Sequence, residues 1–82
     1  MKLRYEILPF ERIRNLRLDK NLTQREVAQL LNVKQNTYSQ YEVGVLRYPA
    51  DVLIKLALFY HTSIDYLVGI TDNPAPYERN VK

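Results

Sequence analysis

The sequence contains no cysteine and a single histidine, His61. Without cysteine, neither disulfides nor thiolate metal sites can form, and this absence is consistent with a cytoplasmic protein. One histidine cannot hold a metal ion alone, and the sequence has neither paired carboxylates nor a glycine-rich phosphate loop. We therefore predict that the protein is not an enzyme and needs neither a metal ion nor a cofactor.

Long apolar runs are also missing. The best candidate, residues 52–60, is interrupted by Lys55 and is shorter than the roughly 18–20 residues that a membrane span needs. The N-terminus lacks the apolar core and the cleavage site of a signal peptide. We expect no membrane segment, and 82 residues with 46% apolar side chains suffice for one domain with a small core.

The net charge of +3 is unevenly distributed along the sequence. Residues 12–47 contain seven basic and three acidic side chains, whereas residues 48–82 contain three basic and four acidic ones. A positive first half suits a surface that faces phosphates. Lysine and arginine on solvated helix faces give the same pattern, so charge alone leaves both interpretations open.

The most informative stretch is residues 23–44, which read TQREVAQLLNVKQNTYSQYEVG. Thr23 and Glu26 have the spacing of a capping box, which marks the start of a helix. Asn32 suits the left-handed conformation of a sharp helix exit. Between these ends lies an apolar face about one turn long, formed by Val27, Ala28 and Leu31.

A second short helix follows the turn at Asn32. Val33 re-enters the core, and Tyr38 and Tyr41 continue an inward face at three-residue spacing. The residues between these anchors are all polar, and a buried back with a polar front is what reading the major groove requires. The stretch therefore predicts a helix-turn-helix.

Capping residues and apolar spacing predict three further helices. The five expected helices span residues 9–20, 23–31, 34–42, 50–60 and a short segment capped by Ser63. The inward residues expected on the first, fourth and fifth helices are Ile13, Leu16, Leu53, Leu56, Ala57, Tyr60, Ile64 and Leu67. We predict an arm at 1–9, a domain at 10–69 and a flexible tail at 70–82, which is rich in proline and poor in apolar residues.

From about Phe10 to Gly69 the chain resembles the phage-repressor and Cro type of helix-turn-helix domain, the XRE family. The resemblance depends on the ordered strings RIRNLRLDKNLTQREVAQLLNV and SIDYLVG, with the Tyr41-Glu42 pair before Gly44 between them. It implies an all-α, compact five-helix bundle of the lambda-repressor type. It also implies a protein that binds operator DNA, usually as a dimer, and regulates transcription in bacteria and phages.

The resemblance assigns roles to individual residues. The base-reading residues it implies are Gln35, Asn36, Ser39 and Gln40, because glutamine and asparagine can contact adenine through N6 and N7. The phosphate-contacting residues it implies are Gln24, Lys34, Arg47 and Arg17. Arg17 has a second interpretation, an ion pair with Glu42, which we place first.

Three features depart from the family pattern. Lys34 stands where the family more often has Ser or Thr, and a lysine side chain cannot accept the capping hydrogen bond. Tyr38 stands where an aliphatic residue is usual, so its hydroxyl needs a partner or solvent. The loop GVLRYPA has Arg47 as its only charge, which weakens the case for phosphate contacts there.

A domain of this kind reads only a few base pairs, so specificity normally requires two copies on an inverted repeat. Ile54 and Leu58, with Val68 nearby, form the patch that we expect to join two copies, although a half-exposed core would give the same pattern. The function predicted is a sequence-specific regulator of transcription that binds double-stranded DNA, a repressor. The alternative is an antitoxin or adaptor in which binding to a protein partner is primary.

Overall fold

A computed structural model describes residues 10–77, and all statements about the structure refer to these residues. The arm predicted at 1–9 and the last residues of the tail, 78–82, lie outside them. Within this range the regular structure consists of helices only, which confirms the all-α prediction. The helices are α1 (Phe10–Asp19), α2 (Gln24–Leu31), α3 (Gln35–Glu42), α4 (Ala50–Phe59) and α5 (Ile64–Leu67).

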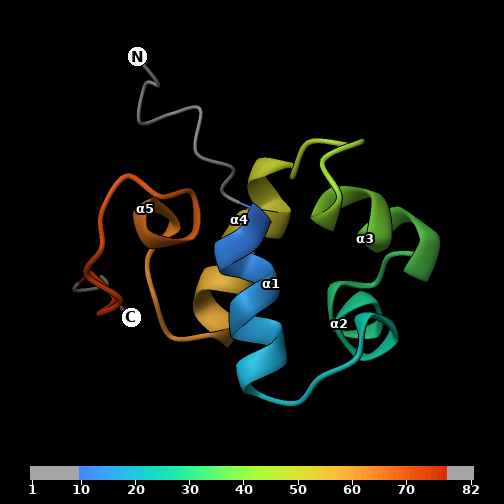
Figure 1. Ribbon diagram of the computed structural model, residues 1–82, viewed down its shortest axis with the longest axis horizontal. Coiled ribbons are helices and arrows are strands. Elements are labelled where there is room, and N and C mark those ends of the chain that lie inside the picture. The colour runs from blue at the N-terminus through green and yellow to red at the C-terminus, as the bar shows by residue number, and fades with distance from the viewer. Residues whose placement is uncertain (1–9, 78–82) are drawn as a thin grey trace.

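The helices form one layered bundle around α1. In Figure 1, α1 crosses the centre of the molecule, α2 and α3 lie on one side of it, and α5 lies on the other side. Helix α4 lies behind α1 in this view and contacts both α2 and α5. The helix-turn-helix is therefore held at one end of the bundle, away from α5.

The ends of the helices follow from single residues. The Thr23 hydroxyl accepts a hydrogen bond from the amide of Glu26, and the Glu26 carboxylate accepts one from the amide of Thr23, which confirms the capping box. Asn32 ends α2 in the left-handed conformation, with φ of 59°. Ser63 caps α5 by accepting the amide of Tyr66, whereas Lys34 gives α3 no side-chain cap, both as expected.

The core is drawn from all five helices. Its most buried large members, each 0% exposed, are Ile13, Tyr38, Leu56 and Leu67. The expected inward residues Ala57 and Tyr60 are also buried, and Leu16 and Leu53 pack against the core from partly exposed positions. The prediction for Ile64 is wrong, because this residue is 36% exposed. As the first residue of a four-residue helix, it has no second turn to fix its face.

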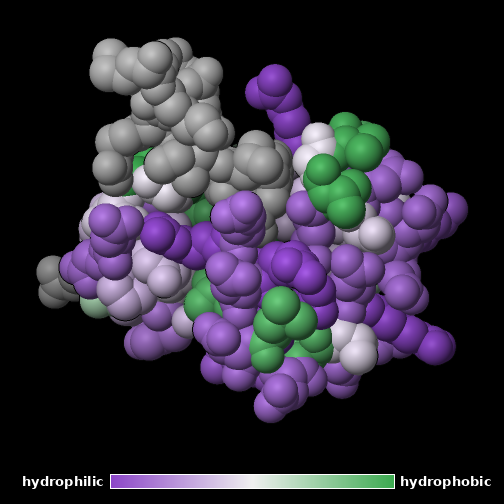
Figure 2. All heavy atoms as spheres, in the orientation of Figure 1, coloured by the Kyte–Doolittle hydropathy of each residue, from purple (hydrophilic) through white to green (hydrophobic). Residues whose placement is uncertain are grey.

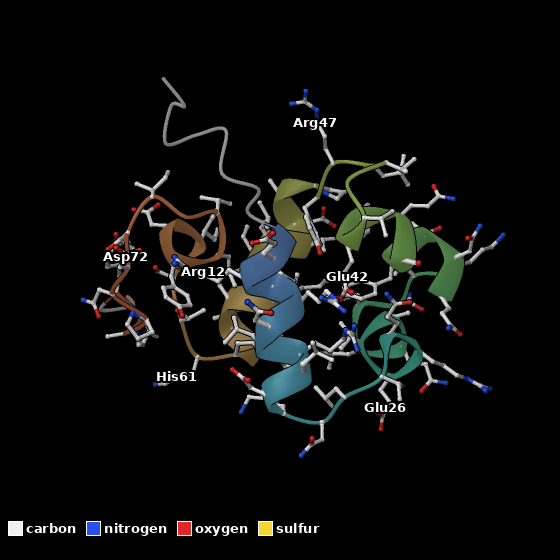
Figure 3. The ribbon with its side chains drawn as sticks, viewed as in Figure 1. Arg12, Glu26, Glu42, Arg47, His61 and Asp72 are labelled. Carbon is white, nitrogen blue, oxygen red and sulfur yellow. The ribbon has the colours of Figure 1, made fainter. Side chains whose placement is uncertain are left out.

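Residues 70–77 lie against the helices, so the packed contacts extend beyond Gly69, where we placed the end of the domain. Arg12 donates hydrogen bonds to the carbonyl oxygens of Tyr66 (2.9 Å) and Thr71 (2.7 Å). The same guanidinium lies 4.2 Å from the centroid of the Tyr66 ring and forms an ion pair with Asp72. Figure 3 shows Arg12 extending from α1 toward the segment that contains Asp72.

Candidate nucleic-acid interface

The turn between α2 and α3 is fixed by backbone hydrogen bonds. The amide of Val33 donates to the carbonyl oxygen of Ala28 (3.0 Å), and the amide of Asn32 donates to that of Gln29 (3.1 Å). The carbonyl oxygens at the end of α2 are thereby satisfied without extending the helix. Helix α3 then packs its back on α2 and α1 through Tyr38 and Tyr41, which are 0% and 7% exposed.

The front of α3 is polar and accessible. Gln35 and Asn36 are exposed, and Ser39 and Gln40, one turn further along the helix, are half-buried. Because residues at i, i+1, i+4 and i+5 lie on one side of an α-helix, the structure brings all four predicted base-reading residues together. Their side chains offer both hydrogen-bond donors and acceptors, the groups that base edges require.

One buried carboxylate joins the three helices that form this surface. Glu42 of α3 accepts two hydrogen bonds from Arg17 of α1, from Nε to Oε2 (2.7 Å) and from Nη2 to Oε1 (3.0 Å). Gln24 of α2 donates to Oε1 (3.0 Å), and the Tyr38 hydroxyl donates to Oε2. The two partners of the ion pair are 8% exposed each. The predicted Arg17–Glu42 ion pair is confirmed.

The network sets the charge state of Glu42. Burial alone would raise the pKa of this carboxyl, but hydrogen bonds from Arg17, Tyr38 and Gln24 outweigh it and hold the pKa below its ordinary value. The hydrogen bond to Glu42 raises the pKa of the Arg17 guanidinium. Burial raises the pKa of the Tyr38 hydroxyl, so it remains protonated and able to donate. At neutral pH the Arg17–Glu42 pair is therefore ionised, while the Tyr38 hydroxyl is neutral.

This lowered pKa predicts a pH dependence of folding stability. Glu42 binds its proton more weakly in the folded chain than in the unfolded chain, so its ionised form contributes stability at neutral pH. That contribution is lost as the pH falls below the ordinary value of 4.5 and through the folded pKa. In denaturant titrations, Glu42→Gln should lower the free energy of unfolding at pH 7 and flatten its decline below pH 4.5. Equal slopes in the two proteins would contradict this assignment.

The residues predicted to contact phosphates occupy different environments. Lys34 and Arg47 are exposed, and Figure 3 shows Arg47 extending outward from the loop after α3. Gln24 is half-buried and uses one N–H of its carboxamide on Glu42. Arg17 is engaged at Nε and Nη2 by Glu42 and at Nη1 by the carbonyl oxygen of Leu22. Their contacts with phosphate remain predictions.

Sequence reasoning missed three parts of this arrangement. Tyr38 and Glu42 are four residues apart, a spacing that places them on one helix face and that could have suggested their hydrogen bond. Gln24 was assigned to phosphate alone, although the same carboxamide donates to Glu42. Tyr48 packs on Tyr41 with ring centroids 5.0 Å apart. That contact holds the loop containing Arg47 against α3, and nothing in the loop sequence indicated it.

The patch predicted to join two copies lies on the other side of the bundle. Ile54 and Leu58 of α4 are 49% and 54% exposed, and Val68 is half-buried. Ile54 and Leu58 line a groove of about 340 Å³ between α4 and α5, which Ile64 and Tyr77 also line; Val68 is not among its lining residues. The Tyr77 hydroxyl donates to the carboxylate of Asp65 (2.6 Å), and both residues line this groove.

The arrangement of α2 and α3 agrees with comparisons to known proteins. Residues 13–67 match the family model described as helix-turn-helix. The chain belongs to the helix-turn-helix family. This confirms the resemblance predicted from residues 10–69. A crystal structure of a transcriptional regulator from Listeria innocua has a TM-score of 0.71 and 32% identity to this chain, covering 90% of it and 63% of the Listeria chain.

Curated relatives fit the same family. The chain is 36% identical over 66 residues to an uncharacterized helix-turn-helix-type transcriptional regulator, YobD, of Bacillus subtilis; the match covers 80% of this chain and 59% of YobD. It is 42% identical over 58 residues to RstR, the cryptic phage CTXphi transcriptional repressor of Vibrio cholerae, covering 71% of this chain and 52% of RstR. The chain thus spans little more than half the length of these relatives. Among residues 10–77, no helix has the length and apolar character of a membrane span.

Proposed function

We propose that this protein is a sequence-specific regulator of transcription, a repressor, that reads the major groove of double-stranded DNA with α3. The observation that carries the proposal is the form of α3, whose polar front is exposed while Tyr38 and Tyr41 anchor its back. Gln35, Asn36 and Gln40 are proposed to contact base edges, with Ser39 as a fourth contact. Membership of the helix-turn-helix family and likeness to named regulators support this proposal.

The contacts with the DNA backbone come from the edges of this surface. Lys34, at the start of α3, and Arg47, in the loop after it, are exposed and are proposed to neutralise phosphates. Gln24 has a second N–H left for a phosphate oxygen after donating to Glu42. Arg17 would act chiefly by fixing α3 through Glu42, since its side chain is 9% exposed. A repressor of this kind works by occupying a promoter in the bacterial cytoplasm, without an enzymatic step.

The test is binding of the purified protein to a randomised DNA duplex library at two salt concentrations, followed by sequencing of the bound pool. Reading by α3 predicts an enriched inverted repeat whose half-site centres lie about one helical turn, roughly 34 Å, apart. Binding that falls steeply with salt and enriches no sequence would reduce the interaction to phosphate contacts. No binding at either salt concentration would reject the proposal and favour the adaptor or antitoxin alternative.

An inverted repeat needs two copies of the protein, and we propose that Ile54 and Leu58 join them, with Val68 at the margin. Leu58→Asp places a charge in this apolar patch and should shift the protein to monomer and weaken operator binding by at least about tenfold. Sedimentation across a concentration series and operator titration measure the two effects. Leu18→Asp, at an exposed leucine of similar exposure (45%) on α1, is the matched control.

A monomer mass for the native protein at all concentrations, with unchanged operator affinity in Leu58→Asp, would contradict the role of this patch. If Leu18→Asp also lost dimerisation and operator binding, the cause would be a general effect of the introduced charge. The variant is informative because Leu58 is 54% exposed, so an aspartate there leaves the core intact.

A further inference from the structure

An exposed valine continues the polar front of α3. Val43 directly follows the last residue of the helix and keeps a right-handed helical conformation, with φ of −86° and ψ of −2°. Asn36, Gln40 and Val43 therefore stand at i, i+4 and i+7, a spacing that places them along one helix face. Val43 is 68% exposed. A branched apolar side chain thus lies at the end of a row of side chains proposed to face base edges.

Two neighbouring apolar residues leave this row. Gly44 reverses the chain in a left-handed conformation, with φ of 86°. The amides of Val45 and Leu46 then both donate to the carbonyl oxygen of Gln40, at 2.9 and 3.1 Å, so the loop folds back over the end of the helix. Figure 2 shows the apolar patch over this loop. Val45 is 70% exposed, about as much as Val43, but it does not continue the row formed by Asn36, Gln40 and Val43.

The major groove presents one apolar group at base edges, the 5-methyl group of thymine. A valine that extends a groove-facing row can contact this methyl group, whereas it can neither donate nor accept a hydrogen bond at any other base. Val43 lies about 4.5 Å further along the α3 axis than Gln40, because an α-helix rises about 1.5 Å per residue. This displacement is comparable to the roughly 3.4 Å rise of one base step, so with α3 lying along the groove Val43 can reach the base pair next to that of Gln40.

We propose that Val43 is a specificity-determining residue that recognises a thymine methyl group beside the bases contacted by Gln40. This proposal rests on the proposed function, because it requires α3 to lie in the major groove. Bases would then be recognised in two ways, by hydrogen bonds from Gln35, Asn36 and Gln40 and by an apolar contact from Val43. The same binding surface would then prefer thymine at one position in each half-site.

The experiment uses the operator enriched from the randomised library by the native protein. Each thymine is replaced singly by deoxyuridine, which removes the 5-methyl group and leaves the hydrogen-bonding edge unchanged. At one position per half-site, this replacement should weaken binding of the native protein by about fourfold, the factor expected for burial of one methyl group. Val43→Ala removes the contact from both half-sites of a dimer, so it should weaken binding to the unmodified operator by about 16-fold, the square of that factor. The variant should also be insensitive to the same replacement.

Val45→Ala is the matched control, since it shortens an equally exposed valine on the other side of the turn. It should keep the full sensitivity to deoxyuridine. Thermal melts of both variants verify folding, which alanine favours at a helix end. The proposal is overturned if no thymine is sensitive, if Val43→Ala keeps the sensitivity, or if Val45→Ala loses it equally. The proposed function would still stand in each of these cases if the native protein enriches an operator and Gln35→Ala weakens binding to it.

Discussion

Replacing Arg17 with methionine should cost about 3–5 kcal/mol of folding stability, because it leaves Glu42 charged and buried without its main partner. The carboxylate would keep only the hydrogen bonds from Gln24 and Tyr38. A chain of 82 residues has a total stability of roughly 4–12 kcal/mol, so this variant should approach the unfolding threshold at room temperature. Urea titration followed by circular dichroism measures the change.

Two further variants separate the ion pair from general effects. Arg14→Met removes an exposed arginine from the same helix and should change stability by less than about 0.5 kcal/mol. The double variant Arg17→Met with Glu42→Met removes both charges and should recover much of the loss, since an apolar pair can replace a buried ion pair. Equal stability of Arg17→Met and Arg14→Met would contradict the stabilising role of the Arg17–Glu42 ion pair.

Gln35→Ala should weaken binding to the enriched operator by roughly 30-fold to 10⁴-fold. Each good bidentate contact with a base is worth about 1–3 kcal/mol, and a dimer loses one such contact in each half-site. Gln35 is exposed at the first position of α3, so its truncation leaves the core untouched. Fluorescence anisotropy with labelled operator and with a scrambled duplex measures the loss of specific binding.

Gln29→Ala provides the control for this prediction, because Gln29 is an exposed glutamine on α2 away from the polar front of α3. It should bind both duplexes like the native protein. Gln35→Ala should keep the weak, salt-dependent binding to the scrambled duplex, since phosphates are contacted by other residues. An equal loss on both duplexes would place Gln35 among the phosphate contacts instead of the base contacts.

The parts of the fold that local chemistry determines were predictable from the sequence. The capping box at Thr23, the left-handed exit at Asn32 and the Ser63 cap each involve residues within a few positions of one another. These contacts need no tertiary information, so the residues that make them mark the helix ends directly. The Arg17–Glu42 pair joins residues 25 apart, and it was expected only because the family resemblance supplied it.

Contacts between distant segments escaped prediction. Residues 70–77 look like a flexible tail in composition, yet Arg12 binds the carbonyl oxygen of Thr71, 59 residues away. The Thr62 hydroxyl likewise donates to the carbonyl oxygen of Pro74 (2.6 Å). Backbone carbonyl groups are present at every residue, so no sequence pattern shows which of them a distant side chain will bind.

In the candidate site, too, local features were predictable from the sequence and contacts between distant residues were not. The polar front of α3 was readable because a buried tyrosine back and a polar face alternate with helical spacing in residues 35–42. The second role of Gln24 was not readable, because it depends on where α2 places its first residue relative to Glu42. The contact proposed for Val43 was not readable either, because single exposed apolar residues are common on protein surfaces.

The central claim, that α3 reads DNA, is tested most directly by nuclear magnetic resonance of the isotope-labelled protein titrated with its enriched operator duplex. We predict that backbone and side-chain amide signals shift along residues 35–43 and at the start of α2. The largest side-chain effects are expected at Gln35, Asn36 and Gln40. Operator-induced shifts confined to α4 and α5, with those of α3 unchanged, would contradict it.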